Sequence, residues 1–306
     1  MKSPVAVLIF NRPEETARVL EAVCRAKPPM LLVVADGPRT ERIGEASRCA
    51  ATRAVLDRFD WKCEIRTNFS AINLGCKRRV AGGLDWVFET VPEAIILEDD
   101  CLPDESFFQY CEELLDRYRD DDRVMHIGGN NFGIDVQSFD SRSYGFSSFA
   151  QVWGWASWRR AWSHFDVNIA AWPDFRRQGG MRGLPLTAAH RAIQEKRWVD
   201  VYSGRVDTWD FQWHFSLMSR KGLAIVPSSN LVTNIGFSAQ ATHTTDTTSD
   251  KSKVPLRPMQ FPLVHPSSVA ANGKIDRDLS EKMLGKSLAG KLIDRGRRLL
   301  YRRRRH

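Results

Sequence analysis

The stretch Ile95-Ile96-Leu97-Glu98-Asp99-Asp100 joins a short apolar run directly to three adjacent carboxylates. A short apolar run of this kind, here 94–97, is typical of a buried strand in a parallel sheet. Ligands bind at the carboxyl ends of strands in open α/β sheets, so we expect the carboxylates to lie at a binding site. Because adjacent carboxylates repel one another, their oxygens favour Mg²⁺ or Mn²⁺. The alternative is a solvated acidic turn that caps a helix starting near Asp104.

Strand and helix patterns alternate through the first half of the chain. Strands separated by helices predict an α/β fold, with a parallel sheet and helices on both faces. Apolar runs predict strands at 5–10, 31–35, 62–67, 94–97, 124–127 and 223–226. The helices are predicted at about 13–26, 40–58, 75–89 and 104–119.

The composition is that of a globular protein. The 306 residues suffice for one large α/β domain, and 42% hydrophobic and 27% charged residues are ordinary values. No apolar run approaches about 18 residues, so no membrane-spanning helix is expected. The apolar run at 5–10 is too short for a signal peptide, which predicts a cytoplasmic protein. The six cysteines form no Cys-x-x-Cys pair and are expected to be reduced thiols.

The net charge of +8 is concentrated at the end of the chain. Residues 280–306 hold ten Lys or Arg against Glu281 and Asp294, so this segment accounts for the whole excess. A basic surface for nucleic acid is therefore not indicated. Leucines among the arginines predict an amphipathic segment that contacts an anionic membrane, such as the inner face of the plasma membrane. The alternative is a disordered, solvated tail.

Polar residues follow three of the predicted strands on one rim of the sheet. Asn11-Arg12 follows the first strand, Asp36-Gly37 the second, and Glu98-Asp99-Asp100 the fourth. This arrangement resembles the GT-A fold of nucleotide-sugar glycosyltransferases. The segment 95–108 is similar to the Glu-Asp-Asp form of the DxD motif, as in N-acetylglucosaminyltransferase I and bacterial family-2-like transferases of surface polysaccharides. The resemblance covers roughly residues 4–245.

The resemblance also implies a division of the chain. Residues 1–140 would form the nucleotide-sugar-binding α/β half. Residues 141–245 would form the acceptor-side and catalytic half of the same domain. Residues 246–279 would be a loop or linker, followed by the basic tail 280–306.

For the donor, the resemblance implies roles residue by residue. Asp100, as the last acid of the motif, would hold Mn²⁺ or Mg²⁺. Glu98 and Asp99 would contact the nucleotide-sugar or the waters bound to the metal. Asp36 would read the base or the ribose. The donor contacts after the first strand would be Asn11 and Arg12, with Arg12 beside the base.

Two further donor-side predictions come from later segments. Lys77 and Arg78 fall near a position that touches the nucleotide, and a diphosphate needs positive charge beyond one metal. The alternative for this pair is a solvated helix face. His243 lies in a loop after the last strand, where the resemblance implies a further metal ligand, and its imidazole would suit Mn²⁺. The alternative is an exposed histidine.

Transfer to a hydroxyl with inversion needs a carboxylate that accepts the hydroxyl proton. The resemblance places this base at Asp210, in the stretch Trp209-Asp210-Phe211-Gln212-Trp213. Asp207 is the second candidate, with a helix N-cap as its structural alternative. For Asp210 the alternative is a structural acid paired with an arginine.

Tryptophans are concentrated in the second half of the chain. Eight of the ten lie between Trp153 and Trp213. The segment 146–162 resembles the acceptor-side segment of bacterial members of the family. Trp153, Gly154 and Trp155 are therefore predicted to contact the acceptor, whereas Trp158 and Trp162, at helical spacing, predict core packing.

Together these features predict an inverting, metal-dependent glycosyltransferase. It would move a sugar from a nucleoside diphosphate donor, UDP foremost, to a glycan or lipid-linked acceptor. One alternative is a nucleotidyltransferase that makes the sugar nucleotide, although Asn11-Arg12-Pro13 stands where a glycine-rich phosphate loop would be needed. The other is a non-catalytic GT-A-like scaffold at the membrane.

Overall fold

The computed structural model describes residues 1–59, 62–236 and 254–285. In this part of the chain, eight strands form one sheet in the order β3-β2-β1-β4-β8-β6-β9-β7, and β5 pairs with β10. The strands are β1 Val5–Ile9, β2 Met30–Ala35, β3 Glu64–Phe69, β4 Glu93–Glu98, β5 Cys101–Pro103, β6 Val124–Gly128, β7 Tyr144–Ser147, β8 Trp155–Trp158, β9 Leu223–Pro227 and β10 Val232–Asn234.

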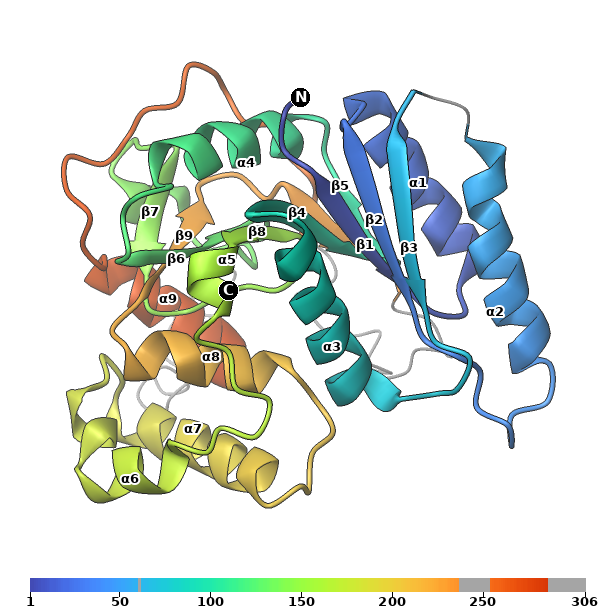
Figure 1. Ribbon diagram of the computed structural model, residues 1–306. Coiled ribbons are helices and arrows are strands. Elements are labelled where there is room, and N and C mark those ends of the chain that lie inside the picture. The colour runs from blue at the N-terminus through green and yellow to red at the C-terminus, as the bar shows by residue number, and fades with distance from the viewer. Residues whose placement is uncertain (60–61, 237–253, 286–306) are drawn as a thin grey trace, which may run out of the picture.

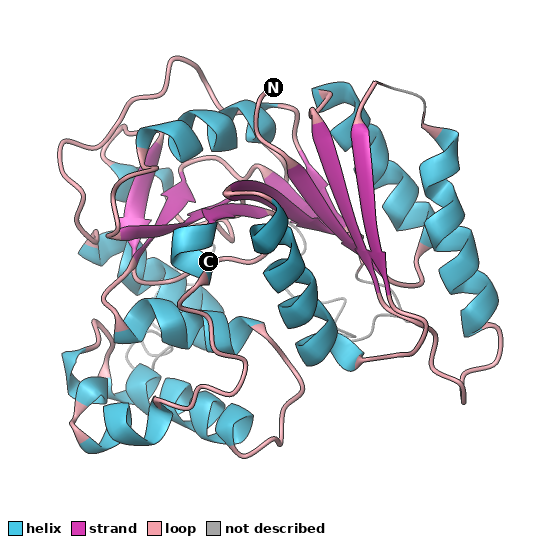
Figure 2. Cartoon of the chain, in the orientation of Figure 1, coloured by secondary structure: helices cyan, strands magenta, loops and turns pink. Residues whose placement is uncertain are grey.

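Helices cover both faces of this sheet (Figures 1 and 2), which confirms the predicted α/β fold. The α-helices are α1 Pro13–Ala26, α2 Glu45–Ala54, α3 Gly75–Thr90, α4 Ser106–Arg117, α5 Arg159–Trp162, α6 Trp172–Arg177, α7 Ala188–Tyr202, α8 Asp210–Ser219 and α9 Gly273–Leu284. Three short 3-10 helices are η1 Val55–Arg58, η2 Val136–Phe139 and η3 Gly180–Gly183.

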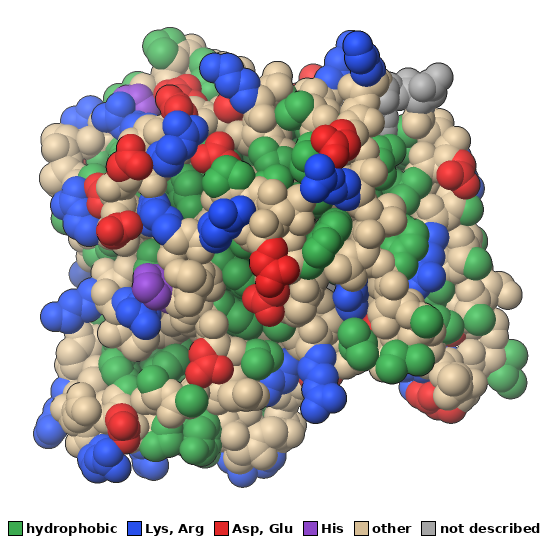
Figure 3. Space-filling view, viewed as in Figure 1, with side chains coloured by type: hydrophobic (Ala, Val, Ile, Leu, Met, Phe, Trp, Pro, Cys, Tyr) green, Lys and Arg blue, Asp and Glu red, His purple; other side chains and the backbone are tan. Residues whose placement is uncertain are grey.

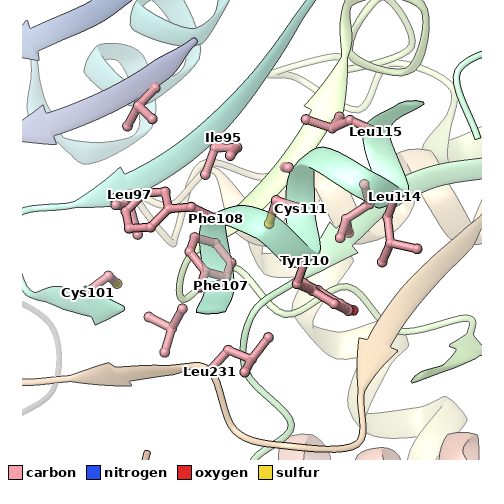
Figure 4. Close-up of a cluster of buried hydrophobic side chains, with 14 of the residues drawn as sticks. Ile95, Leu97, Cys101, Phe107, Phe108, Tyr110, Cys111, Leu114, Leu115 and Leu231 are labelled. Atoms are coloured by element: carbon pink, nitrogen blue, oxygen red, sulfur yellow. The ribbon is translucent and has the colours of Figure 1, made fainter. Parts of the chain in front are cut away.

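The core has one layer on each face of the sheet because successive side chains of a strand point to opposite faces. In β1, Val5 and Val7 pack in the layer that contains α1 and α4, whereas Ala6 and Leu8 pack in the layer that contains α3. Figure 4 shows β4 contributing Ile95 and Leu97 to the layer beneath α4. These alternating layers fix the register of β4, and therefore the position where the acidic triplet begins.

The sheet is not wholly parallel as predicted. β8 lies between β4 and β6 and is antiparallel to both, and β7 is antiparallel to β9. The residues of β8, Trp155-Ala-Ser-Trp158, were expected in a loop and a helix. They form a strand because aromatic residues favour strands and both faces of β8 are covered by the core.

The helix α9 was not predicted and runs through the expected boundary at residue 280. The side chain of Asn272 caps it by accepting from the backbone N–H of Lys274 at 2.9 Å. Its Ile275 and Leu279 are buried in a third core cluster with α7 and α8. Residues 273–279 are therefore helical rather than a linker. None of the helices in the described residues is long and apolar enough to cross a membrane.

Candidate active site

The polar rim predicted from the sequence lies at a reversal in strand order. β1 is parallel to β2 on one side and to β4 on the other. The chain runs outward from β1 through β2 and β3, and then returns to place β4 on the opposite side of β1. Ligands of open α/β sheets bind at such a switch point, outside the carboxyl ends of the strands.

A cavity of about 580 Å³ opens at this position, within the range of small-molecule sites. It brings together residues after β1, β2 and β4 and residues before α8, which are distant in the sequence. Of the residues singled out from the sequence, the cavity is lined by Asn11, Arg12, Asp36, Glu98, Asp99, Asp100, Trp153, Asp207 and Asp210.

The acidic triplet begins at Glu98, the last residue of β4, and its positive partner is Arg12. The Arg12 guanidinium lies 3.1 Å from Asp99 Oδ1 and also donates to Asp100 Oδ2. The second oxygen of each aspartate accepts another hydrogen bond. Asp99 Oδ2 accepts from the backbone N–H of Phe10 at 3.0 Å, and Asp100 Oδ1 accepts from Asn234 Nδ2 at 3.0 Å. A buried network therefore replaces the solvated acidic turn that was the alternative. Arg12 was predicted to lie beside the base of the donor, and the structure instead pairs its side chain with Asp99 and Asp100.

The triplet carries more negative charge than Arg12 can neutralise. Burial, followed by repulsion from Asp100 and Asp99, raises the pKa of Glu98. Burial and repulsion from Asp100 likewise raise the pKa of Asp99, against the opposing effect of Arg12. Burial and repulsion between carboxylates cause both pKa shifts. A further cation at this position would stabilise the ionised carboxylates.

Whether a divalent metal fits can be judged from this donor set. In residues 1–59, 62–236 and 254–285, no three His, Cys, Asp or Glu side chains converge as a metal site built by the protein alone. Hard carboxylate oxygens and surplus negative charge nevertheless suit Mg²⁺ or Mn²⁺ that keeps other positions for ligand and water. The residues fit such a metal: Asp100 would hold it, as predicted from the sequence, with Glu98 beside it. His243, the other predicted ligand, lies outside the described residues.

Asp36 is buried, and both of its oxygens are occupied by neighbouring groups. Oδ1 accepts the N–H groups of Gly37 and Leu74, each at 2.9 Å. Oδ2 accepts Asn73 Nδ2 and the N–H of Gly75, each at 3.1 Å. Because these bonds tie the end of β2 to the start of α3, Asp36 holds this wall of the cavity in place and has little capacity left to read a ligand.

Among the basic residues at the start of α3, the one that lines the cavity is not one of the two that were predicted to touch the nucleotide. Lys77 and Arg78 do not line the cavity, and Arg78 is exposed, which agrees with the solvated-face alternative. Arg79 lines the cavity instead and is 9% exposed. Its Nη2 donates to Asn68 Oδ1 at 2.8 Å, while its buried Nε has no hydrogen-bond partner in the described chain. Its Nη1 has no hydrogen-bond partner in the described residues and can donate to a ligand.

Asp210 is the first residue of α8 and faces the cavity opposite the triplet's strand. The hydroxyl of Thr208 donates to its Oδ1. No arginine or lysine of the described residues forms an ion pair with it, although its charge acts on the largely buried Arg197: burial lowers the pKa of that guanidinium, and Asp210 opposes this shift. Asp207 also lines the cavity but is exposed, and its Oδ2 lies beside Gly75 at the start of α3.

The predicted acceptor contacts separate into one cavity residue and two core residues. Trp153 lines the cavity and makes an edge contact with Phe132 at 5.1 Å. The prediction for Trp155 is wrong: its side chain is fully buried and stacks on Trp209 at 5.8 Å. Gly154 does not line the cavity, and a Cβ there would lie 2.6 Å from Val232, so core packing explains this glycine.

We expect Trp155→Ala to lower the free energy of unfolding by about 3–5 kcal/mol, because it removes a large side chain from a packed aromatic cluster. Urea denaturation followed by circular dichroism measures this change. Tyr202→Ala is the matched control, since Tyr202 is 50% exposed and should cost less than about 1 kcal/mol. Equal effects of the two substitutions would contradict the assignment of Trp155 to the core.

Arg39 and Arg79 line the cavity and the buried Glu45 of α2 pairs with Arg39, but none of the three was singled out from the sequence. Arg79 was treated only as part of a basic run. The helix period could have separated Arg79 from Lys77 and Arg78. Side chains that are one or two positions apart on a helix point to different faces. No local pattern marks Glu45.

Comparison with known proteins gives distant likenesses only. No family model and no curated protein matches the sequence. UDP-glucose pyrophosphorylase complexed with UDP-glucose is similar, at 7% identity over 73% of this chain and 89% of that chain, with a TM-score of 0.36. Mouse xyloside xylosyltransferase 1 in its apo form shares 12% identity over 72% and 82%, with a TM-score of 0.33. The synthase of 4-diphosphocytidyl-2C-methyl-D-erythritol from Anaerococcus prevotii DSM 20548 shares 12% identity over 53% of this chain and 74% of that chain, with a TM-score of 0.34. None is similar enough to transfer a function.

Proposed function

We propose that this chain is an inverting glycosyltransferase that moves a sugar from a nucleoside diphosphate to a hydroxyl of a glycan or lipid-linked acceptor. One observation carries the proposal. A single cavity at the switch point between β1 and β4 has the acidic triplet on one side and Asp210, without an ion pair in the described chain, on another. Such a cavity supplies both a place for a cation with its diphosphate and a base for the acceptor.

The residues divide the reaction between them. A divalent Mn²⁺ or Mg²⁺ held by Asp100, with Glu98 beside it, would supply positive charge to the leaving diphosphate. Asp210 accepts the proton of the acceptor hydroxyl as that oxygen attacks the anomeric carbon. Attack opposite the departing diphosphate inverts the anomeric centre. Trp153 offers an aromatic wall to the acceptor sugar, since its side chain lines the same cavity.

The face of the molecule shown in Figure 3 agrees with a sugar substrate better than with a nucleic acid. On the face shown in Figure 3, acidic and basic side chains are interspersed, and no broad basic patch covers it. Nucleic-acid binding by phosphate contacts needs clustered Lys and Arg. The basic segment 280–306, of which only 280–285 is described, would serve to hold the enzyme at an anionic membrane that carries a lipid-linked acceptor.

A nucleotide-release assay tests the proposed function. Single UDP-sugars are incubated with the protein and Mn²⁺, with and without a mixture of glycan and lipid-linked acceptors, and UDP is measured. Release that the acceptors accelerate is the expected result. Formation of a UDP-sugar and pyrophosphate from UTP and a sugar 1-phosphate would instead identify a nucleotidyltransferase. Nucleotide binding with neither reaction would identify the scaffold.

A further inference from the structure

Glu45, the first residue of α2, is a buried carboxylate that none of the roles above uses. Its side chain is 6% exposed. It accepts from the backbone N–H of Arg39 at 2.7 Å, from Arg39 Nε at 3.0 Å and from Asn11 Nδ2 at 2.9 Å. The hydrogen bonds from Arg39 lower the pKa of Glu45, so the carboxylate is ionised at neutral pH. Glu45 thus ties the loop after β2 to the residue after β1.

This arrangement fixes the orientation of the Asn11 amide. An ionised carboxylate only accepts hydrogen bonds, so the amide nitrogen of Asn11 must face Glu45. The amide oxygen then points away from Glu45, and no group of the described residues donates to it. Since Asn11 lines the cavity, the chain presents a fixed acceptor there.

Donors accompany this acceptor on the same side of the cavity. Arg39 lines the cavity and uses Nε and Nη2 for Glu45, which leaves Nη1 without a partner in the described chain. Arg79 lines it as well, and its Nη1 has no hydrogen-bond partner in the described chain. One acceptor accompanied by guanidinium donors matches a planar base whose edge presents one N–H between two carbonyl oxygens. The acceptor would bind the N–H, and the guanidinium groups would bind the carbonyl oxygens.

The position of this group relative to the triplet suits a nucleoside. β2 and β4 flank β1, so the ends of β2 and β4 are two strand spacings apart, about 10 Å. A diphosphate beside the triplet at β4 would therefore place its nucleoside towards β2. Apolar side chains of Leu8 and Val34 line the cavity there and can contact a planar base.

We infer that Asn11, oriented by Glu45, selects a uridine nucleotide against a cytidine nucleotide. Uracil has a donor N3–H between two carbonyl oxygens, whereas cytosine has an unprotonated N3 and an exocyclic amine. The amide oxygen of Asn11 accepts a hydrogen bond from the N3–H of uracil. With cytosine, the same oxygen faces the unprotonated N3, which is itself an acceptor. The inference rests on the proposed function, because it concerns the donor of that reaction, and it gives Glu45 a positioning role.

Calorimetric titration of UDP and of CDP in the presence of Mn²⁺ tests the inference in the full chain. Wild type should bind UDP about tenfold or more tightly than CDP, because an unsatisfied buried acceptor is costly. In Glu45→Gln the new amide can donate to Asn11, so Asn11 can turn its nitrogen to the cavity. The ratio should then fall to within about threefold. Glu41→Gln, an exposed glutamate of the same loop, is the control and should keep the wild-type ratio.

Asn11→Ala provides a second route if Glu45→Gln does not fold. It removes the acceptor itself and should lower UDP affinity more than CDP affinity. Wild type that binds the two nucleotides equally, or a ratio unchanged in both variants, would overturn the inference and leave the proposed function standing. Wild type that binds neither UDP, CDP, GDP nor ADP would overturn both.

Discussion

Asp210→Asn is expected to lower the rate of sugar transfer by about two to four orders of magnitude, the usual contribution of a general base. The amide has the same shape as the carboxylate but cannot take the proton of the acceptor hydroxyl. Nucleotide affinity should stay within about threefold of wild type, because Asp210 is assigned to the acceptor and not to the donor. UDP release in the presence of acceptor measures the first quantity, and calorimetry with UDP measures the second.

Asp207→Asn is the matched control for this prediction. Asp207 carries the same group in the same cavity, three residues away, but is exposed and lies beside Gly75. Its variant should retain more than about a tenth of the wild-type rate. If the Asp207 variant is inactive and the Asp210 variant is active, the base is Asp207. If both variants transfer sugar normally, the assignment of a carboxylate base in this cavity is wrong.

The central strands β1, β2 and β4 could be predicted because they are buried on both faces. Continuous apolar runs such as 31–35 and 94–97 are typical of central parallel strands, and the structure has β2 and β4 there. β8 could not be predicted this way. It is four residues long, and it is specified by pairing with β4 some sixty residues earlier in the chain. Trp155 was wrongly predicted to contact the acceptor because its burial is set by that distant pairing.

The candidate site shows the same division between local and distant information. The triplet after β4 could be located from its own sequence, since the end of a strand and its acids are adjacent. The positive partner of the triplet could not be predicted in this way. That partner is Arg12, which follows β1 and lies 87 residues before Asp99 in the chain. Likewise, Asp36 was taken as a free carboxylate, but the groups that occupy it come from residues 73–75. Side-chain partners fixed by tertiary structure are invisible in a linear motif.

Asp100→Asn should abolish the dependence of UDP binding on Mn²⁺. In wild type we expect Mn²⁺ to raise UDP affinity by about tenfold or more, because a divalent cation offsets the charge of both the triplet and the diphosphate. In the variant the gain should be less than about threefold, since an amide oxygen is a much weaker ligand than a carboxylate. Titration of UDP with Mn²⁺ and with a chelator measures the two affinities.

The affinity without metal separates loss of a metal ligand from loss of the fold. Among the described residues, Arg12 alone forms an ion pair with the triplet. Removing one charge from the triplet weakens the repulsion of the diphosphate, so metal-free UDP binding should stay equal or become tighter. A damaged fold would weaken binding in both conditions. Glu105→Gln, a control on the same segment with a 75% exposed side chain, should behave as wild type in both. If Asp100→Asn keeps the full effect of Mn²⁺, Asp100 does not hold the metal, and its bonds to Arg12 and Asn234 are purely structural.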